Sequence, residues 1–296
     1  MNDFEFVAPR TIDEAVAVLA KHDGRAKLLA GGTDILVQLR ERLRQADVVI
    51  DVKKIAELQE MRLGGQDGGA GGLWLGAAVP CYRIYGDARV ASAYPGLVDA
   101  ARIIGGWQIQ SRASIGGNLC NSSPAADSIP TLLAYSATCH LAGPGGRRTL
   151  PVAKFCTAPG RNALARGEML VAIEFPPPAT RSSCAYERFI PRNEMDIAVV
   201  GAASWVRLDL SCKRIEEARI ALAAVAPTPV VADEASQWLA GQPVSDETFA
   251  QAGERAKAAA RPISDKRGPA EYRTHLVEVL VRRTLARAVE RATHVL

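Results

Sequence analysis

The sequence of 296 residues lacks the marks of several protein classes. It has no run of about 18 consecutive apolar residues, so we expect no membrane-spanning helix. The net charge is only +4, from 36 basic and 32 acidic residues, and its dispersal argues against a nucleic-acid-binding surface. The opening residues, MNDFEFVAPR, contain no basic stretch followed by an apolar one, so no secretory signal is expected.

Signatures of metal sites and disulfide scaffolds are also missing. There are only six cysteines, no two of them have CxxC spacing, and the four histidines are scattered. The sequence therefore predicts neither a metal site nor a disulfide framework. We expect the cysteines to be buried, reduced thiols in a cytoplasmic protein. They are Cys81, Cys120, Cys139, Cys156, Cys184 and Cys212.

What the sequence does contain is an ordinary globular composition, with 48% hydrophobic and 23% charged residues. Its length suits two or three domains. The clearest interruption is the run of three prolines at 176–178, where we place a domain boundary. Strands and helices alternate before this run, and strands are followed by helices after it, which indicates an α+β protein.

Before the prolines, the chain opens with a predicted β-α-β-α-β unit and a small mixed sheet. Thr11 and Glu14 form a capping box ahead of the first helix, and Thr33 is the expected cap of the second. A glycine-rich hairpin loop is predicted at 64–72. The predicted strands are 4–7, 27–30, 48–52, 74–77, 138–141, 147–150 and 169–175, and the helices are 12–21, 34–42 and 95–104.

After the prolines, three antiparallel strands are predicted at 185–189, 198–208 and 215–225. Three helices follow at 231–239, 245–259 and 269–291, and the last is predicted to be a partly solvated packing helix. No internal repeat of about 20–50 residues is present.

Two short glycine motifs are candidates for a binding site. They are AGGTD at 30–34 and SIGGN at 114–118. Consecutive amides in such turns can form a concave anion site, and a helix beginning at Thr33 would add its positive end. Each motif alone is more typical of a plain turn, but two of them suit a pyrophosphate held from both sides. Neither the GxGxxG motif of a Rossmann site nor the GKS or GKT of a P-loop is present.

Three longer segments carry a resemblance to one family. They are LLAGGTDIL, ASIGGNLCNSSPAADSIPTLLA and MDIAVVGAA, in this order. Together they resemble the FAD-binding medium subunit of molybdenum hydroxylases, such as bacterial xanthine dehydrogenase and carbon monoxide dehydrogenase. The resemblance extends from Phe4 to about Ala288.

The resemblance implies a fold. It is a vanillyl-alcohol-oxidase-type FAD-binding domain at 1–176, made of two α+β subdomains at about 1–55 and 56–176. A C-terminal domain at 180–290, with a three-stranded antiparallel sheet and three helices, would follow. The elements predicted independently after the prolines agree with this arrangement.

The resemblance also implies which residues hold FAD. The first pyrophosphate motif would be Leu28, Leu29, Ala30, Gly31, Gly32, Thr33, Asp34 and Ile35, with the amides of Gly31, Gly32 and Thr33 as donors. The second would be Ser114, Ile115, Gly116, Gly117 and Asn118. Asp127 would accept hydrogen bonds from the ribose, and Leu170 or Val171 would cover the adenine end. Ile104 and Gly105 would line the flavin ring, and Arg188 would lie near the pyrimidine side of that ring.

Several of these residues have plainer interpretations. Asp127 precedes a probable helix at Ile129 and could simply cap it. Trp107 and Gln108 are predicted to pack their own loop, and Arg112 could be a surface charge. Some family members have Phe where Ile104 stands, so no aromatic stacking on the flavin is expected here. The chain between Cys81 and Cys139 is too compact for the cysteine-bearing insertion of one family branch, so FAD is the only cofactor expected on this chain.

The implied function is electron transfer. In the family, a large subunit carries the molybdopterin cofactor and a small one carries two 2Fe–2S clusters, in a doubled heterotrimer. Electrons pass from molybdenum through the clusters to FAD and then to an external acceptor, so no catalytic acid or base is expected on this chain. A stand-alone flavin oxidase and a non-catalytic scaffold are the alternatives. Neither the substrate nor the acceptor is evident from this sequence.

Overall fold

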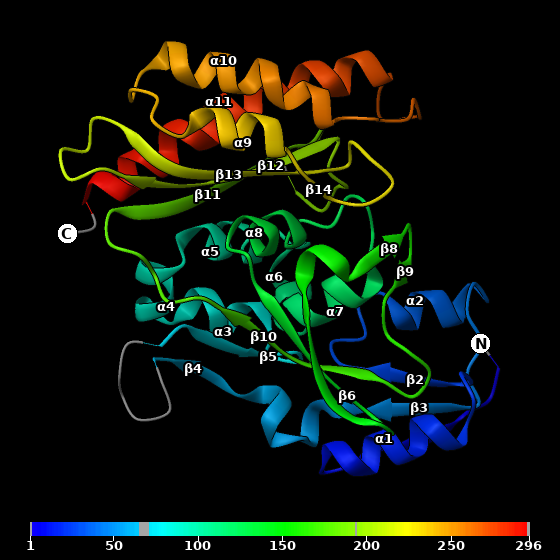
Figure 1. Ribbon diagram of the computed structural model, residues 1–296. Helices are drawn as coiled ribbons and strands as arrows, with labels where there is room; N and C mark the ends of the chain where they lie inside the picture. Colours follow the sequence, from blue (N-terminus) through cyan, green and yellow to red (C-terminus); the bar gives the residue numbers. More distant parts are fainter. Residues whose placement is uncertain (1, 65–70, 193, 295–296) are drawn as a thin grey trace.

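The computed structural model describes residues 2–64, 71–192 and 194–294 (Figure 1). The chain opens with a three-stranded sheet in the order β1-β3-β2, with helices between its strands. Both strand pairings are parallel, so the prediction of a mixed sheet is wrong. The strands run in the same direction because each connecting helix carries the chain back to the end of the sheet where the previous strand began. The elements are β1 (Glu5–Val7), α1 (Ile12–Lys21), β2 (Ala26–Leu29), α2 (Ile35–Arg40) and β3 (Val48–Asp51).

Local signals at the two helix starts have different outcomes. The capping box is confirmed, because Thr11 Oγ1 accepts a hydrogen bond from the Glu14 amide and the Glu14 side chain accepts one from the Thr11 amide. The predicted cap of α2 is wrong. Its N-cap is Asp34 rather than Thr33, and no side chain caps the helix.

A five-stranded antiparallel sheet follows, in the order β4-β5-β10-β6-β7. The predicted hairpin is confirmed at its base, where the Gly64 amide donates to the Gly72 carbonyl at 3.0 Å; residues 65–70 of the predicted loop lie outside the described residues. β10 is central and almost wholly buried. The strands are β4 (Met61–Leu63), β5 (Leu73–Gly76), β6 (Thr138–Gly143), β7 (Gly146–Pro151) and β10 (Met169–Phe175), with a small hairpin of β8 (Cys156–Ala158) and β9 (Arg161–Asn162).

Short helices connect β5 to β6 and cover this sheet. Two of them were predicted from the sequence. The helix expected at Ile129 does begin there, and the helix predicted at 95–104 ends three residues early, at Ala101 instead of Ile104, because the chain turns at Gly105 with a φ of +62°. The helices are α3 (Cys81–Gly86), α4 (Ala88–Ala93), α5 (Pro95–Ala101), α6 (Trp107–Gln110), α7 (Ile115–Asn121) and α8 (Ile129–Ala134); the 3-10 turns are η1 (Val52–Lys54), η2 (Ala56–Gln59) and η3 (Val152–Lys154).

The C-terminal part contains an antiparallel sheet in the order β11-β12-β13-β14 and a layer of helices. The three predicted strands are present, but β14 adds a fourth, two-residue strand that takes up the start of the helix predicted at 231–239. The elements are β11 (Ser182–Phe189), β12 (Val200–Leu208), β13 (Ile215–Ala223), β14 (Val230–Val231), α9 (Asp233–Leu239), α10 (Asp246–Ala256), η4 (Lys257–Ala259) and α11 (Ala270–His294).

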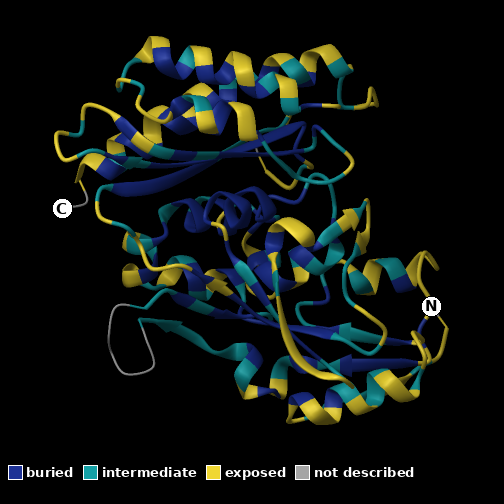
Figure 2. Ribbon diagram, viewed as in Figure 1, coloured by how far each residue is buried: buried dark blue, intermediate teal, exposed yellow. Residues whose placement is uncertain are grey.

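Helices cover both faces of this last sheet (Figure 1). α9, α10 and α11 lie on one face, and α5 and α8 lie on the other. The strands are therefore buried on both sides, as the dark ribbon in Figure 2 shows, which explains why β12 has the nearly continuous apolar sequence VGAASWVRL. The observed mixture of sheets and helices confirms the α+β class.

Candidate functional site

The first glycine motif meets the residues just before the second in the folded chain: Arg112 donates from Nε to the carbonyl of Gly31, 81 residues earlier, at 3.1 Å. A Cβ atom added at Gly31 would overlap the backbone carbonyl of Arg112. A Cβ atom added at Gly116 would overlap the backbone of Ala77, just after β5. These two glycines are therefore required by close approach of the neighbouring chain.

The other two motif glycines are not in close contact with neighbouring backbone. Gly32 has a φ of +81°, which is a left-handed conformation that side chains disfavour. Gly117 has no positive φ, and a Cβ atom added there would meet only the Ser114 Oγ, at 3.1 Å. No neighbouring backbone occupies the space beside Gly117, so that space is open for a ligand.

The second motif is a helix start rather than a free loop. Ser114 is the N-cap of α7, and its Oγ accepts a hydrogen bond from the Gly117 amide at 3.0 Å. That amide is therefore engaged, while the Ser114 hydroxyl proton is still available for donation. Asn118 Oδ1 accepts a hydrogen bond from Ser128 Oγ at 2.6 Å, which turns the Asn118 amide nitrogen away from Ser128.

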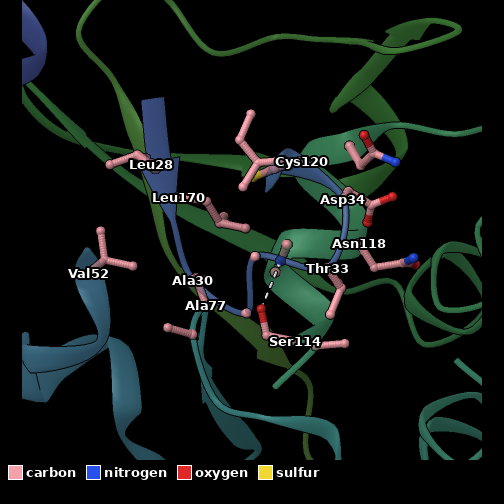
Figure 3. Close-up of a pocket in the computed structure, with 18 of the residues that line it drawn as sticks. Leu28, Ala30, Thr33, Asp34, Val52, Ala77, Ser114, Asn118, Cys120 and Leu170 are labelled. Carbon is pink, nitrogen blue, oxygen red and sulfur yellow. Dashed lines mark hydrogen bonds between the residues drawn. The ribbon is translucent and has the colours of Figure 1, made fainter. Parts of the chain in front are cut away.

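The two motifs line one cleft with a volume of about 190 Å³ (Figure 3). The sequence-predicted residues that line it are Leu28, Ala30, Gly31, Gly32, Thr33, Asp34, Ile35, Ile104, Ser114, Gly116, Gly117, Asn118 and Leu170. The predicted residues that do not line it are Leu29, Gly105, Ile115, Asp127 and Arg188. Leu29 and Ile115 point into the hydrophobic core instead, because neighbouring side chains on a strand or helix face different ways.

The structure adds lining residues that the sequence did not suggest. They are Gln38, Arg44, Val52, Leu58, Ala77, Ala78, Ala113, Cys120, Asn121 and Met169. Two of them could have been found from their sequence positions. Gln38 lies four residues after Asp34 and therefore on the same side of α2. Val52 directly follows β3, and β3 pairs with β2, the strand that carries Leu28. The positions of Arg44 and Leu58 depend on long-range packing.

The amides of the first turn have the character of an anion site. Among the described residues, no acceptor is hydrogen-bonded to the amides of Gly31, Gly32 or Thr33. Backbone N–H groups without protein partners at a concave turn are suited to phosphate oxygens. Together with the open side of Gly117, they fit the pyrophosphate of a dinucleotide such as FAD.

Two titratable groups in the cleft, Asp34 and Cys120, are shifted toward their neutral forms. Burial raises the pKa of the Asp34 carboxyl, and it raises the pKa of the Cys120 thiol to about 12. Cys120 is therefore a protonated thiol at neutral pH and not an activated nucleophile. The apolar wall of the cleft, from Leu28, Val52 and Leu170, is visible in Figure 3.

Asp127 lies at the junction with the C-terminal part of the chain. Its Oδ2 accepts a hydrogen bond from Arg188 at 2.6 Å, and its Oδ1 accepts one from the Tyr186 hydroxyl at 2.9 Å. Burial raises the pKa of Asp127 to about 6, although both partners lower it. The capping alternative is wrong, because the N-cap of α8 is Ser128, and no side chain caps that helix. The ribose role of Asp127 stays a prediction, as does the flavin role of Arg188.

Trp107 does not pack its loop as expected. Its side chain is 83% exposed, because α6 is a single short turn at the surface and projects it outward. Ile104, three residues before that helix, is buried and lines the cleft.

Two features are absent from the described residues. Within residues 2–64, 71–192 and 194–294, no group of three or more His, Cys, Asp or Glu side chains is placed to hold a metal ion. In the same part of the chain, no helix is both long and apolar enough to cross a membrane.

Comparison with known proteins gives the same assignment for both parts of the chain. Residues 2–178 match the family model described as FAD binding domain in molybdopterin dehydrogenase, and residues 185–288 match the CO dehydrogenase flavoprotein C-terminal domain. The chain is 34% identical over 283 residues to the putative xanthine dehydrogenase FAD-binding subunit of Escherichia coli, covering 95% of this chain and 94% of that one. It is 33% identical to the carbon monoxide dehydrogenase medium chain of Afipia carboxidovorans, covering 98% of each.

A solved structure has the same fold. A chain of carbon monoxide dehydrogenase from Hydrogenophaga pseudoflava, in a form that lacks the Mo-pyranopterin moiety of the molybdenum cofactor, superposes with a TM-score of 0.92 at 32% identity. The superposition covers 98% of both chains.

Proposed function

Because this chain belongs to the FAD-binding subunits of molybdopterin dehydrogenases, we propose that it holds one FAD non-covalently in the cleft and relays electrons through it. The electrons would come from 2Fe–2S clusters of a partner subunit and leave to an external acceptor. The observation that supports this most strongly is that the amides of Gly31, Gly32 and Thr33 have no acceptor among the described residues, together with the open space beside Gly117 in the same cleft.

Each wall of the cleft has a separate task in this proposal. The amides of the first turn would bind the pyrophosphate, and the Ser114 hydroxyl and the Asn118 amide nitrogen would donate from the second motif. The apolar side chains of Leu28 and Leu170 would exclude water from the rest of the cofactor. When bound, FAD supplies the ability to accept and release electrons, and this chain supplies its binding and orientation.

Partner subunits would complete the enzyme. We infer a large subunit with the molybdopterin cofactor and a small subunit with two 2Fe–2S clusters, in a doubled heterotrimer. The names of the relatives support this, since one is a medium chain and the Hydrogenophaga enzyme is described by its molybdenum cofactor. Six free cysteines support a cytoplasmic location.

The substrate would be chosen by the large subunit. Relatives named for xanthine and for carbon monoxide are 34% and 33% identical to this chain over most of its length. Since similar flavin subunits accompany different substrates, the cleft in this chain would recognise the cofactor and not the substrate.

The test is a visible spectrum and metal analysis of the purified protein with whatever subunits accompany it. We expect a flavin spectrum, with iron and molybdenum in the same complex. Protein without flavin that also fails to bind added FAD would contradict the proposal and favour a scaffold. A flavoprotein that oxidises a substrate by itself, without iron or molybdenum, would favour the stand-alone oxidase.

A further inference from the structure

Three consecutive carbonyl groups of the first glycine turn are hydrogen-bonded. Ala30 O accepts from Lys53 Nζ at 3.2 Å, and Gly31 O accepts from Arg112 Nε at 3.1 Å. Gly32 O accepts from the Leu36 amide at 3.1 Å, in the turn that leads into α2. The carbonyl groups are thus engaged by the protein, in contrast to the amides that follow them.

The geometry of the peptide unit links these bonds to the free amides. In a planar trans peptide, the carbonyl of one residue and the amide of the next point in opposite directions. A hydrogen bond to Ala30 O therefore sets the direction of the Gly31 amide, and a bond to Gly31 O sets that of the Gly32 amide. The bond to Gly32 O does the same for Thr33.

Two of these three anchors are cationic side chains from other segments. Lys53 lies in η1 and is held in place by Asp51 Oδ1 at 2.6 Å. Arg112 lies just before the second motif. A pair of adjacent glycines has wide conformational freedom, so without anchors these peptides would rotate and the amides would not keep one direction.

From these contacts we propose that Lys53 and Arg112 are positioning residues, which orient the amides of the pyrophosphate turn before FAD binds. The inference rests on the proposed function, because it assigns these amides to the FAD pyrophosphate. Preorganised donors bind more tightly than flexible ones, since the ordering cost is met during folding. Arg112 is thereby assigned a specific task in place of a general surface charge.

The test compares ligands with and without a pyrophosphate. Apo-protein would be prepared for the wild type, Arg112→Gln and Lys53→Met, and each would be titrated with FAD, ADP and adenosine. We expect the dissociation constants of FAD and ADP to rise roughly 10-fold in each variant, the effect of one lost hydrogen bond to a charged group, and that of adenosine to change much less. Arg112→Lys, which keeps a cationic donor, should recover part of the affinity.

A matched control is available in the C-terminal part of the chain. Arg214 also donates from its guanidinium to a glycine carbonyl, that of Gly241, at 2.9 Å. Arg214→Gln should leave all three affinities unchanged. Melting temperatures of the apo-proteins identify variants that fail to fold. Substitutions at Lys53 and at Arg112 test the inference independently of each other.

The outcomes separate this inference from the proposed function. Wild-type affinity for ADP in both folded variants would overturn the positioning role and leave FAD binding intact. An equal loss for ADP and adenosine would also overturn it, because it would indicate a general distortion of the cleft. Failure of the wild type to bind FAD would overturn both.

Discussion

Gly117→Ala is expected to separate cofactor binding from folding. The added methyl group would face the open side of α7, where its nearest described neighbour is Ser114 Oγ at 3.1 Å. Gly117 has no positive φ, so alanine fits its backbone conformation. Replacing glycine by alanine inside a helix stabilises it by up to about 1 kcal/mol. The apo-protein should therefore be as stable as the wild type or slightly more so.

FAD binding should respond in the opposite direction. A methyl group beside the phosphate-binding turn would hold the pyrophosphate away from its donors. We expect a weakening of roughly 10-fold or more for alanine, and on the order of 1,000-fold for the bulkier Gly117→Val, which removes most of the pyrophosphate contacts. Flavin fluorescence during titration of the stripped proteins measures the affinity, and thermal unfolding of the same samples measures the stability.

Two other glycines provide the comparisons. Gly116→Ala would press a methyl group against the backbone of Ala77 and should destabilise the apo-protein by about 1–3 kcal/mol. Gly86→Ala, at the end of α3, has no atom within 4 Å of the added Cβ and should leave FAD affinity unchanged. Full flavin occupancy in purified Gly117→Val would refute the reasoning, because the open space beside Gly117 would then not be where the cofactor binds.

Three further outcomes are expected. Because Asp127 has a pKa of about 6 in the folded protein against an ordinary value of 3.8, the folded state binds the extra proton, and its stability should fall by about 3 kcal/mol as pH rises from about 3 to about 7; this step should be absent from urea unfolding curves of Asp127→Asn. If Asp127 also serves the ribose, the same variant should bind FAD roughly 5- to 100-fold more weakly at neutral pH, while unchanged affinity would remove Asp127 from the site. Denaturation should release all the flavin, and phosphodiesterase should split it into FMN and AMP; flavin retained on the precipitated protein would show a covalent link.

Features encoded within a few residues were predictable from the sequence. The capping box of Thr11 and Glu14 depends on residues three apart, and it is present. The three long strands after the proline run were predicted from their own sequences, and they are present within about two or three residues of the predicted bounds. The position of both glycine motifs in one cleft followed from the resemblance and their spacing, and the folded chain brings them together.

Features that depend on distant partners were not predictable. All four motif glycines look alike in the sequence, yet Gly31 and Gly116 are fixed by neighbouring backbone and Gly117 is not. The bond from Arg112 to Gly31 joins residues 81 apart, and the ion pair of Asp127 and Arg188 joins residues 61 apart. Such pairs leave no periodic signal in the sequence. Only the folded chain shows that Asp127 lies against β11, where the two parts of the chain meet.

The measurement that tests the central claim most directly is a structure of the purified protein with FAD bound. The account predicts pyrophosphate oxygens within hydrogen-bonding distance, about 3 Å, of the amide nitrogens of Gly32 and Thr33, with Gly117 in contact on the opposite side. A pyrophosphate bound elsewhere, with these amides facing solvent, would contradict it.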